Sequence, residues 1–321
     1  MGKLVSIGEI LVDFIPKQKG VPLCEVIEFE RVAGGAPANV AACVSKLGEN
    51  ALVLSKLGED AFGDFLINEL KNCNVDTSFI KRTNKANTGL AFVSLKEDGN
   101  RDFSFYRNPS ADMLLSPEEI GDNIINEGDV LHFCSVDLID SPMKLAHKKA
   151  IAQAIKNNAI ISFDPNVRLP LWENHEDLRT TIKEFIPYAH ILKISDEELE
   201  FITKEEKIEN ALIKLFVGNV KIVIYTKGPN GAELYTKKRT FRHNGYKVNA
   251  IDTTGSGDSF IGAFIYRILG EKRSTQSILL ADFESYLEFS NKVGAIVASQ
   301  KGGIPSMPSL QKTRSFLSKN E

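Results

Sequence analysis

The residues Gly255-Ser256-Gly257-Asp258 combine a turn of small residues with an acid, directly before an apolar stretch that predicts a helix. The N-terminus of a helix binds anions, because its first backbone N–H groups lack partners and the helix dipole is positive there. A carboxylate gains nothing from lying beside a phosphate. A general base that deprotonates an attacking hydroxyl, however, has to lie beside it. The spacing therefore predicts phosphoryl transfer with Asp258 as the base.

The same turn permits a simpler interpretation. It can be a tight connection between a strand, which we predict at Tyr246–Ile251, and the following helix, with Asp258 only a favourable first-turn charge. Two common nucleotide-binding motifs are excluded. Phe260 occupies the third glycine position of a dinucleotide fingerprint, and Gly-x-x-x-x-Gly-Lys-Ser/Thr occurs nowhere in the chain.

The composition is that of a soluble globular protein, with 321 residues, 43% hydrophobic and 25% charged. A net charge of −3 gives no reason to expect a nucleic acid or an anionic membrane as partner, and no apolar run approaches the length of a membrane span. The four cysteines lack metal or redox spacing and the five histidines do not cluster. We therefore expect free thiols in the cytoplasm and no zinc site.

Short apolar runs alternate with helical patterns along most of the chain. Strands are predicted at Lys3–Ile7, Ala51–Leu57, Asp129–Ser135, Ala159–Asp164, Ile191–Ile194 and Lys221–Thr226. Helices are predicted near Ala36–Leu47, Phe62–Asn72, Met143–Asn157, Glu176–Ile186, Asp196–Ile202 and Glu209–Phe216. Further along, Ala232–Arg242 predicts a hairpin and Thr275–Gln300 one or two helices. This order predicts an α/β fold with a mostly parallel sheet between helices.

Two regions, at about residues 11–33 and 88–107, lack helical patterns and show the apolar–polar alternation of strands. The second contains a Glu97-Asp98-Gly99-Asn100 turn and predicts a hairpin. These regions can form a small separate sheet, either as a lid over the site or as a plain edge hairpin. No linker divides the chain, so we expect residues 1–321 to form a single domain.

Polar or glycine-rich segments follow five of the predicted strands or precede helices. They are Gly8-Glu9 with Asp13, Gly34-Gly35, Asp164-Pro165-Asn166-Val167-Arg168, Ser195-Asp196-Glu197-Glu198 and Thr226-Lys227-Gly228-Pro229-Asn230-Gly231. Each has a structural alternative: an exposed Asp13, a plain glycine turn, an Asp164–Arg168 ion pair, or Ser195 as a helix cap. The carboxyl ends of parallel strands share one edge of a sheet, so the segments together predict one large polar site.

Two segments then identify a family. Gly34-Gly35-Ala36-Pro37-Ala38-Asn39-Val40-Ala41 and Asp252-Thr253-Thr254-Gly255-Ser256-Gly257-Asp258 resemble the two signatures of the ribokinase-like (PfkB-type) carbohydrate kinases, over roughly residues 3–310. Within that family the chain is most similar to fructokinases. The similarity lies in Gly8–Asp13, in Phe105–Asp112 and in Asp164–Trp172.

The resemblance implies a ribokinase-like fold with a small β-sheet lid, and transfer of the γ-phosphate of ATP to a primary hydroxyl of fructose. It implies Asp258 as general base, Gly255, Ser256 and Gly257 as anion hole, and Arg168 near the transferring phosphate. The implied sugar contacts are Asp13, Gly34, Gly35, Asn39 and Arg107. The implied nucleotide contacts are Lys193, Ser195, Thr226, Gly228, Gly231 and Asn291. Glu198 is implied for Mg²⁺, and Asp252, Thr254, Gly302 and Ser306 for a monovalent cation, usually K⁺.

Two departures and several alternatives accompany this resemblance. Ser195 replaces the asparagine common in the family, and Ser256 replaces an alanine. A 2-keto-3-deoxygluconate kinase, a ribokinase or a nucleoside kinase is the nearest rival to a fructokinase. A non-catalytic sugar sensor and a nicotinamide-dependent dehydrogenase are more distant ones. By the same resemblance, a homodimer through the lids is expected.

Overall fold

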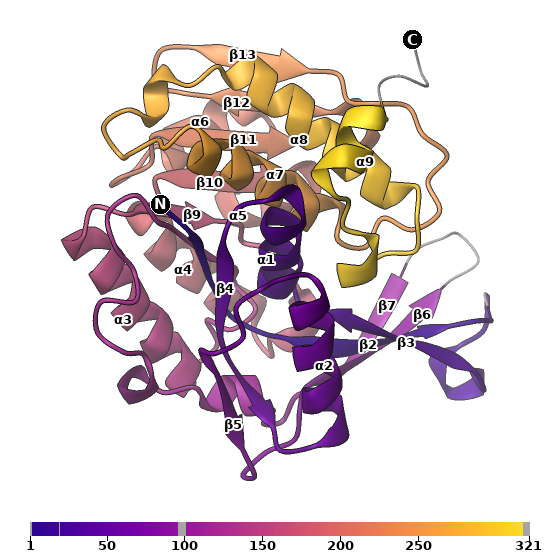
Figure 1. Ribbon diagram of the computed structural model, residues 1–321. Coiled ribbons are helices and arrows are strands. Elements are labelled where there is room, and N and C mark those ends of the chain that lie inside the picture. The colour runs from indigo at the N-terminus through magenta and orange to yellow at the C-terminus, as the bar shows by residue number, and fades with distance from the viewer. Residues whose placement is uncertain (1, 19, 96–100, 317–321) are drawn as a thin grey trace.

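Two β-sheets organise the chain in a computed structural model that describes residues 2–18, 20–95 and 101–316 (Figure 1). The larger sheet has nine strands in the order β13-β12-β11-β10-β9-β8-β1-β4-β5. In chain order these are β1 (Leu4–Ile7), β4 (Ala51–Gly58), β5 (Ile80–Thr83), β8 (Val130–Phe133), β9 (Ile160–Phe163), β10 (Ile191–Ser195), β11 (Ile222–Thr226), β12 (Ala232–Tyr235) and β13 (Thr240–His243). The pairs β11–β12 and β12–β13 are antiparallel, and the other neighbouring strands pair parallel.

Helices cover both faces of this sheet. One face carries α1 (Ala36–Leu47), α2 (Ala61–Asn72), α7 (Ser256–Gly270) and α8 (Phe283–Ala298). The other carries α3 (Pro142–Lys156), α4 (His175–Phe185), α5 (Asp196–Thr203) and α6 (Ile208–Leu215). Along β11, Ile222 and Ile224 enter the first core and Val223 the second. Alternate residues of a strand face opposite sides, so continuous apolar runs fit a sheet buried on both faces.

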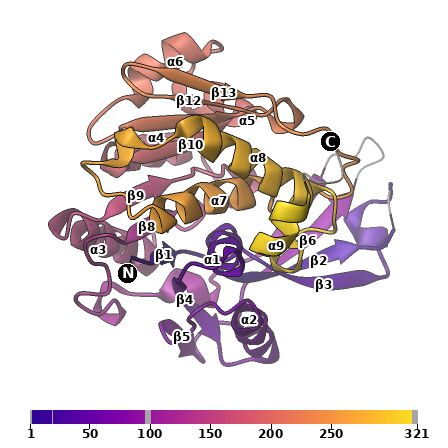
Figure 2. The same cartoon turned by 45° about the horizontal axis from the view of Figure 1, so that its top comes forward.

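The smaller sheet has the order β3-β2-β6-β7 and lies to one side of the larger one in both views (Figure 1, Figure 2). Its strands are β2 (Leu11–Pro16), β3 (Phe29–Gly34), β6 (Leu90–Leu95) and β7 (Arg101–Tyr106). Phe14 stacks on Phe92 at 4.7 Å between ring centroids and meets Phe62 of α2 edge-on at 5.7 Å. Aromatic packing thus attaches this sheet to the main body.

The predicted α/β fold with a small second sheet is confirmed, and all six predicted strands are present. The predicted strand at Tyr246–Ile251 is wrong. Residues 244–250 have no regular structure, and the backbone N–H groups of Ile251 and Asp252 donate to Ala298 O at the end of α8. A helix end, not a sheet, therefore fixes this segment.

Further observations concern the chain's organisation. The edge strand β5 was not predicted, and the expected turn at residues 97–100 lies outside the described residues. The short helix α9 (Leu310–Ser315) closes the described chain. None of the helices in the described ranges combines the length and apolarity that a membrane span needs. The assignment of residues 1–321 to a single domain stays a prediction.

Candidate functional site

A cavity of about 380 Å³ opens beyond the carboxyl ends of β1, β8, β9 and β10. This is the edge at which open parallel sheets bind ligands. The predicted site residues on its wall are Asp13, Gly35, Asn39, Arg168, Lys193, Ser195, Glu198, Thr254, Gly255, Gly257 and Asp258. Segments more than 200 residues apart in sequence therefore meet at one site, as the strand-end argument predicted.

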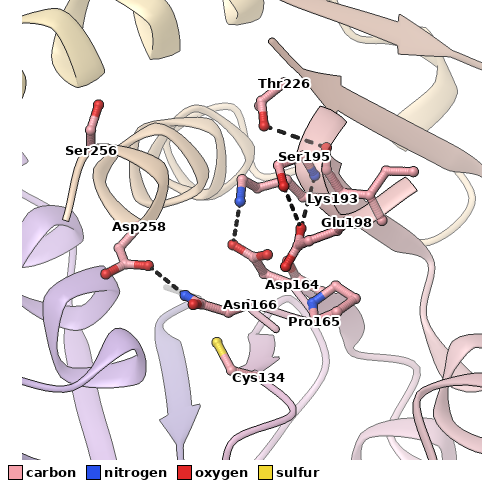
Figure 3. Close-up of polar contacts among 12 residues, drawn as sticks. Cys134, Asp164, Pro165, Asn166, Lys193, Ser195, Glu198, Thr226, Ser256 and Asp258 are labelled. Atoms are coloured by element: carbon pink, nitrogen blue, oxygen red, sulfur yellow. Dashed lines mark hydrogen bonds and ion pairs between the residues drawn. The ribbon is translucent and has the colours of Figure 1, made fainter. Parts of the chain in front are cut away.

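Asp258 lies in the first turn of α7, and its side chain is clamped by two amides. Asn39 Nδ2 donates to Oδ2 at 2.8 Å. Asn166 Nδ2 donates to Oδ1 at 3.0 Å, and Figure 3 shows this second bond. Burial raises the pKa of Asp258 above its ordinary value, while Asn39, Lys193, Arg168 and Asn166 oppose that rise. Amide donors and nearby cations favour the ionised form. The two amides thus hold the carboxyl in one orientation, and with the cations they favour the state that accepts a proton against the effect of burial.

The turn before α7 presents backbone N–H groups to the cavity. Gly255 has φ 77°, a left-handed conformation that disfavours any side chain. Ser256 N–H donates to Thr253 O at 3.1 Å, whereas the N–H groups of Gly255 and Gly257 have no recorded partner in the described part of the chain. The turn can therefore hold an anion. The Ser256 side chain points away and donates to Gly294 O of α8 at 3.0 Å.

Two cations lie near Asp258. Lys193 of β10 pairs with Asp164 at 2.7 Å (Figure 3), and its Nζ would lie 3.4 Å from a Cβ added to Gly257. Burial tends to lower the pKa of Lys193, but Asp164 and Glu198 outweigh it and raise the value to about 12. Burial raises the pKa of Asp164 to about 7 against the effect of Lys193. Lys193 and Arg168 thus bring positive charge to the wall that faces the anion-binding turn.

Glu198 is occupied by hydrogen bonds at both of its oxygens. Oε2 accepts the N–H of Ser195 at 2.8 Å and its hydroxyl at 3.0 Å, which forms the capping box of α5. Oε1 accepts the N–H of Val167 at 2.7 Å. The helix-cap alternative for Ser195 is therefore present, and Glu198 also anchors the loop after β9. The alternative Asp164–Arg168 ion pair is not observed, because Asp164 pairs with Lys193.

The residues predicted for a monovalent cation lie next to the anion-binding turn. Asp252 Oδ1 accepts the N–H of Thr254 at 2.8 Å, and Oδ2 accepts that of Gly302 at 3.0 Å. Ser306 Oγ donates to Gly303 O at 2.7 Å. The bond between Gly302 and Asp252 joins the two loops, and the other two bonds are local to one loop each. Cation binding there stays a prediction, and the described residues contain no cluster of His, Cys, Asp or Glu suited to a metal ion.

Several predicted site residues are not on the cavity wall. Gly34 packs under Asp13, where a Cβ would lie 2.1 Å from Oδ2. Arg107 is buried against Asp112 and Asp137. Thr226 is the last residue of β11, and Gly228 and Gly231 belong to the turn that follows. The side chain of Asn291 donates within α8 to Leu287 O. Their predicted ligand contacts are therefore not tested by the geometry.

Two side chains at the site received no role from the sequence. Asn166 has φ 49°, a left-handed conformation that asparagine tolerates, and its amide reaches Asp258. Glu9 lies on the cavity wall beside Asp13. Both were visible as polar residues after predicted strands. Only their convergence on the cavity distinguishes them from ordinary loop residues.

Comparison with known proteins agrees with this geometry. The profile of the pfkB family carbohydrate kinases matches residues 1–310. The chain is 43% identical to a probable fructokinase-2 of Arabidopsis thaliana, over 98% of this chain and 96% of that protein. A Xylella fastidiosa fructokinase with bound ATP superposes with a TM-score of 0.89 at 30% identity, covering 99% of this chain and 98% of that one. A Vibrio cholerae fructokinase bound to fructose, ADP and calcium does so with a TM-score of 0.88 at 30% identity, covering 99% of each chain. The chain belongs to the pfkB family of carbohydrate kinases.

Proposed function

We propose that this chain transfers the γ-phosphate of ATP to a primary hydroxyl of fructose, giving fructose 6-phosphate and ADP. The observation that carries the proposal is the clamped Asp258 carboxylate beside the anion-binding turn of α7. Similarity to plant fructokinases over nearly the whole chain supports the choice of sugar. A solved relative that holds fructose and ADP supports it further.

In this mechanism Asp258 accepts the proton of the sugar hydroxyl as its oxygen attacks the γ-phosphorus. The bond between that phosphorus and the bridging oxygen breaks, and the electron pair leaves with ADP. The N–H groups of Gly255 and Gly257, with Arg168 and Lys193, stabilise the charge that develops on the phosphoryl oxygens. Asn39 and Asn166 keep the base oriented throughout. Each of these side chains lies on the wall of the one cavity, so no large rearrangement is required to assemble them.

Sugar and nucleotide are assigned to different parts of the site. We propose that Asp13, Gly34, Gly35 and Asn39 bind the sugar. Ser195, Thr226, Gly228, Gly231 and Asn291 are proposed to bind the nucleotide. The small sheet of β2, β3, β6 and β7 is proposed to act as a lid that excludes water and limits ATP hydrolysis. Its strand β2 carries Asp13, so sugar binding and lid position are linked through one strand.

Divalent and monovalent cations are expected with the nucleotide. Glu198 offers hard carboxylate oxygens to Mg²⁺, and its existing hydrogen bonds favour contact through water. Asp252, Thr254, Gly302 and Ser306 are proposed to surround K⁺. Bound Mg²⁺ would neutralise phosphate charge. An Escherichia coli relative has been solved with ATP and Mg²⁺, and a Vibrio cholerae fructokinase variant with potassium.

We also propose a cytoplasmic enzyme that forms a homodimer through the small sheets and needs neither nucleic acid nor membrane. The cysteines are free thiols, as a reducing compartment requires. Light scattering during gel filtration tests the dimer. A mass of about 36 kDa for the native protein would contradict it, because one chain has 35.5 kDa.

An ADP-release assay over a panel of sugars tests the proposed substrate. Fructose should give the highest kcat/KM among fructose, 2-keto-3-deoxygluconate, ribose and a nucleoside. ³¹P NMR of the fructose product should show the phosphate on the O6 oxygen. The variant Asp258→Asn serves as control for contaminating kinases. A rival substrate used more efficiently than fructose would replace the proposed one while leaving the kinase chemistry in place.

A further inference from the structure

Glu9 is a buried acid on the cavity wall, and only one of its two carboxyl oxygens accepts a hydrogen bond from the described residues. It follows β1, and 3% of its surface is exposed. Oε1 accepts the N–H of Ala36 at 2.9 Å, at the start of the helix that carries Asn39. Oε2 is buried and has no hydrogen-bond partner in the described part of the chain. An unpaired buried acceptor is costly unless a ligand or water satisfies it, so Oε2 needs a donor.

Arg107 is not on the cavity wall, but its positive charge acts on Glu9. Its side chain is 4% exposed, and Nη2 contacts both Asp112 and Asp137. Burial raises the pKa of Glu9 to about 7, and the charge of Arg107 is the largest effect that opposes this rise. A guanidinium held by two carboxylates is poorly available to a ligand. It is well placed to stabilise the ionised form of Glu9.

We propose that Glu9 is a sugar-binding, specificity-determining residue: Oε2 accepts a hydrogen bond from a hydroxyl of a neutral sugar, and Arg107 acts through Glu9 without touching the sugar. The inference rests on the proposed sugar kinase function and changes the role expected for Arg107. A hydroxyl is the complementary group, because it can donate to an ionised carboxyl oxygen and can also accept from a protonated one. Glu9 and Asp13 together make this wall suited to a polyol.

A double-mutant cycle on Glu9 and Arg107 tests the inference, with fructose affinity measured by calorimetry and KM values by ADP release. Glu9→Gln keeps an oxygen for Ala36 N–H but turns the free acceptor into an amide donor. We expect it to weaken fructose binding by about 10- to 100-fold with the KM for ATP within about 2-fold. Arg107→Lys should weaken fructose binding several-fold in the native background and by less than about 2-fold when Glu9 is already Gln.

Ser110→Ala is the matched control. Ser110 donates to Asp112 at 2.5 Å, inside the same buried cluster but away from the cavity wall, so fructose affinity should not change. Thermal unfolding reports whether each variant is folded. If Glu9→Gln unfolds, Glu9→Asp keeps the charge, withdraws it by one methylene, and carries the same expectation.

The outcomes separate the two proposals. Native fructose affinity in the Glu9 variants overturns the role of Glu9. An equal effect of Arg107→Lys in both backgrounds shows that Arg107 acts independently of Glu9 and also overturns the inference. If the native protein phosphorylates fructose in these cases, the proposed function survives. A native protein that neither binds nor phosphorylates fructose overturns both.

Discussion

Removing the Asn166 amide tests whether its hydrogen bond keeps the general base Asp258 ionised. Asn166 is pinned on both sides, since Pro165 O accepts the N–H of Ser135 at 3.0 Å and Val167 N–H donates to Glu198 at 2.7 Å. The substitution Asn166→Ala therefore deletes the bond to Asp258 and leaves the loop anchored. That bond stabilises the ionised carboxylate, so its loss raises the pKa of Asp258.

The size of the effect follows from the charge on the acceptor. A hydrogen bond to a charged group contributes about 1.5–3 kcal/mol, and its loss disfavours the ionised form of Asp258 relative to the neutral form. Only the ionised form of Asp258 accepts the proton, so activity is lost as the pH falls through its pKa. The acid limb of the kcat/KM profile should accordingly move to higher pH. At low pH the variant should be about 10- to 100-fold slower than the native enzyme.

The assay is ADP release with fructose from pH 5 to 9, compared with Asn123→Ala as control. Asn123 is exposed, shares the left-handed backbone with φ 63°, and lies before β8, away from the cavity. Both variants should lose about 1 kcal/mol of stability because alanine disfavours that conformation. Only Asn166→Ala should move the acid limb. A rate ratio to native enzyme that is equal at every pH would refute the electrostatic role of Asn166.

Other substitutions probe the elements around the base. Gly255→Ala places a Cβ at φ 77°, 3.1 Å from the side chain of Met307. The variant should have a kcat at least about 10-fold lower and, by urea denaturation, an unfolding free energy about 1–2 kcal/mol lower. A native rate would contradict the assignment of Gly255 to the anion hole. Ser256→Ala loses the hydrogen bond to Gly294, so the free energy of unfolding should fall by about 1 kcal/mol while the KM for fructose stays unchanged. An altered KM would place Ser256 at the sugar instead. Glu198→Ala should lower the free energy of unfolding by about 1–2 kcal/mol and raise the Mg²⁺ concentration that gives the half-maximal rate. An unchanged Mg²⁺ requirement would leave Glu198 with a capping role alone.

Local patterns determined most of the fold. The run Ile222-Val223-Ile224 is apolar throughout because both faces of β11 are covered, and Gly48 ends α1 in a left-handed conformation directly after Leu47. The edge strand β5 has the sequence Ile-Lys-Arg-Thr, which gives a weak strand signal because one edge is unpaired. The segment before Asp252 looked like a strand, but tertiary bonds to the end of α8 fix it.

The site residues that belong to a sequence motif could be predicted. Those that come together only through folding were harder to predict. Asp258 and the Gly255 turn follow from residue type and spacing. The role of Asn166 depends on a left-handed backbone and a loop pinned by Ser135 and Glu198, which no spacing rule contains. The family resemblance likewise implied Arg107 as a sugar contact. The carboxylates that bury its guanidinium come from positions 112 and 137, brought together only by folding.

The most direct measurement is single-turnover phosphoryl transfer by native protein and by Asp258→Asn, with fructose and ATP affinities determined separately. The native chain should form fructose 6-phosphate in step with ADP. The variant should transfer at least about 100-fold more slowly while binding both substrates within about 3-fold of native affinity. Transfer by Asp258→Asn at a near-native rate would contradict the account, because the clamped carboxylate would then not be the base.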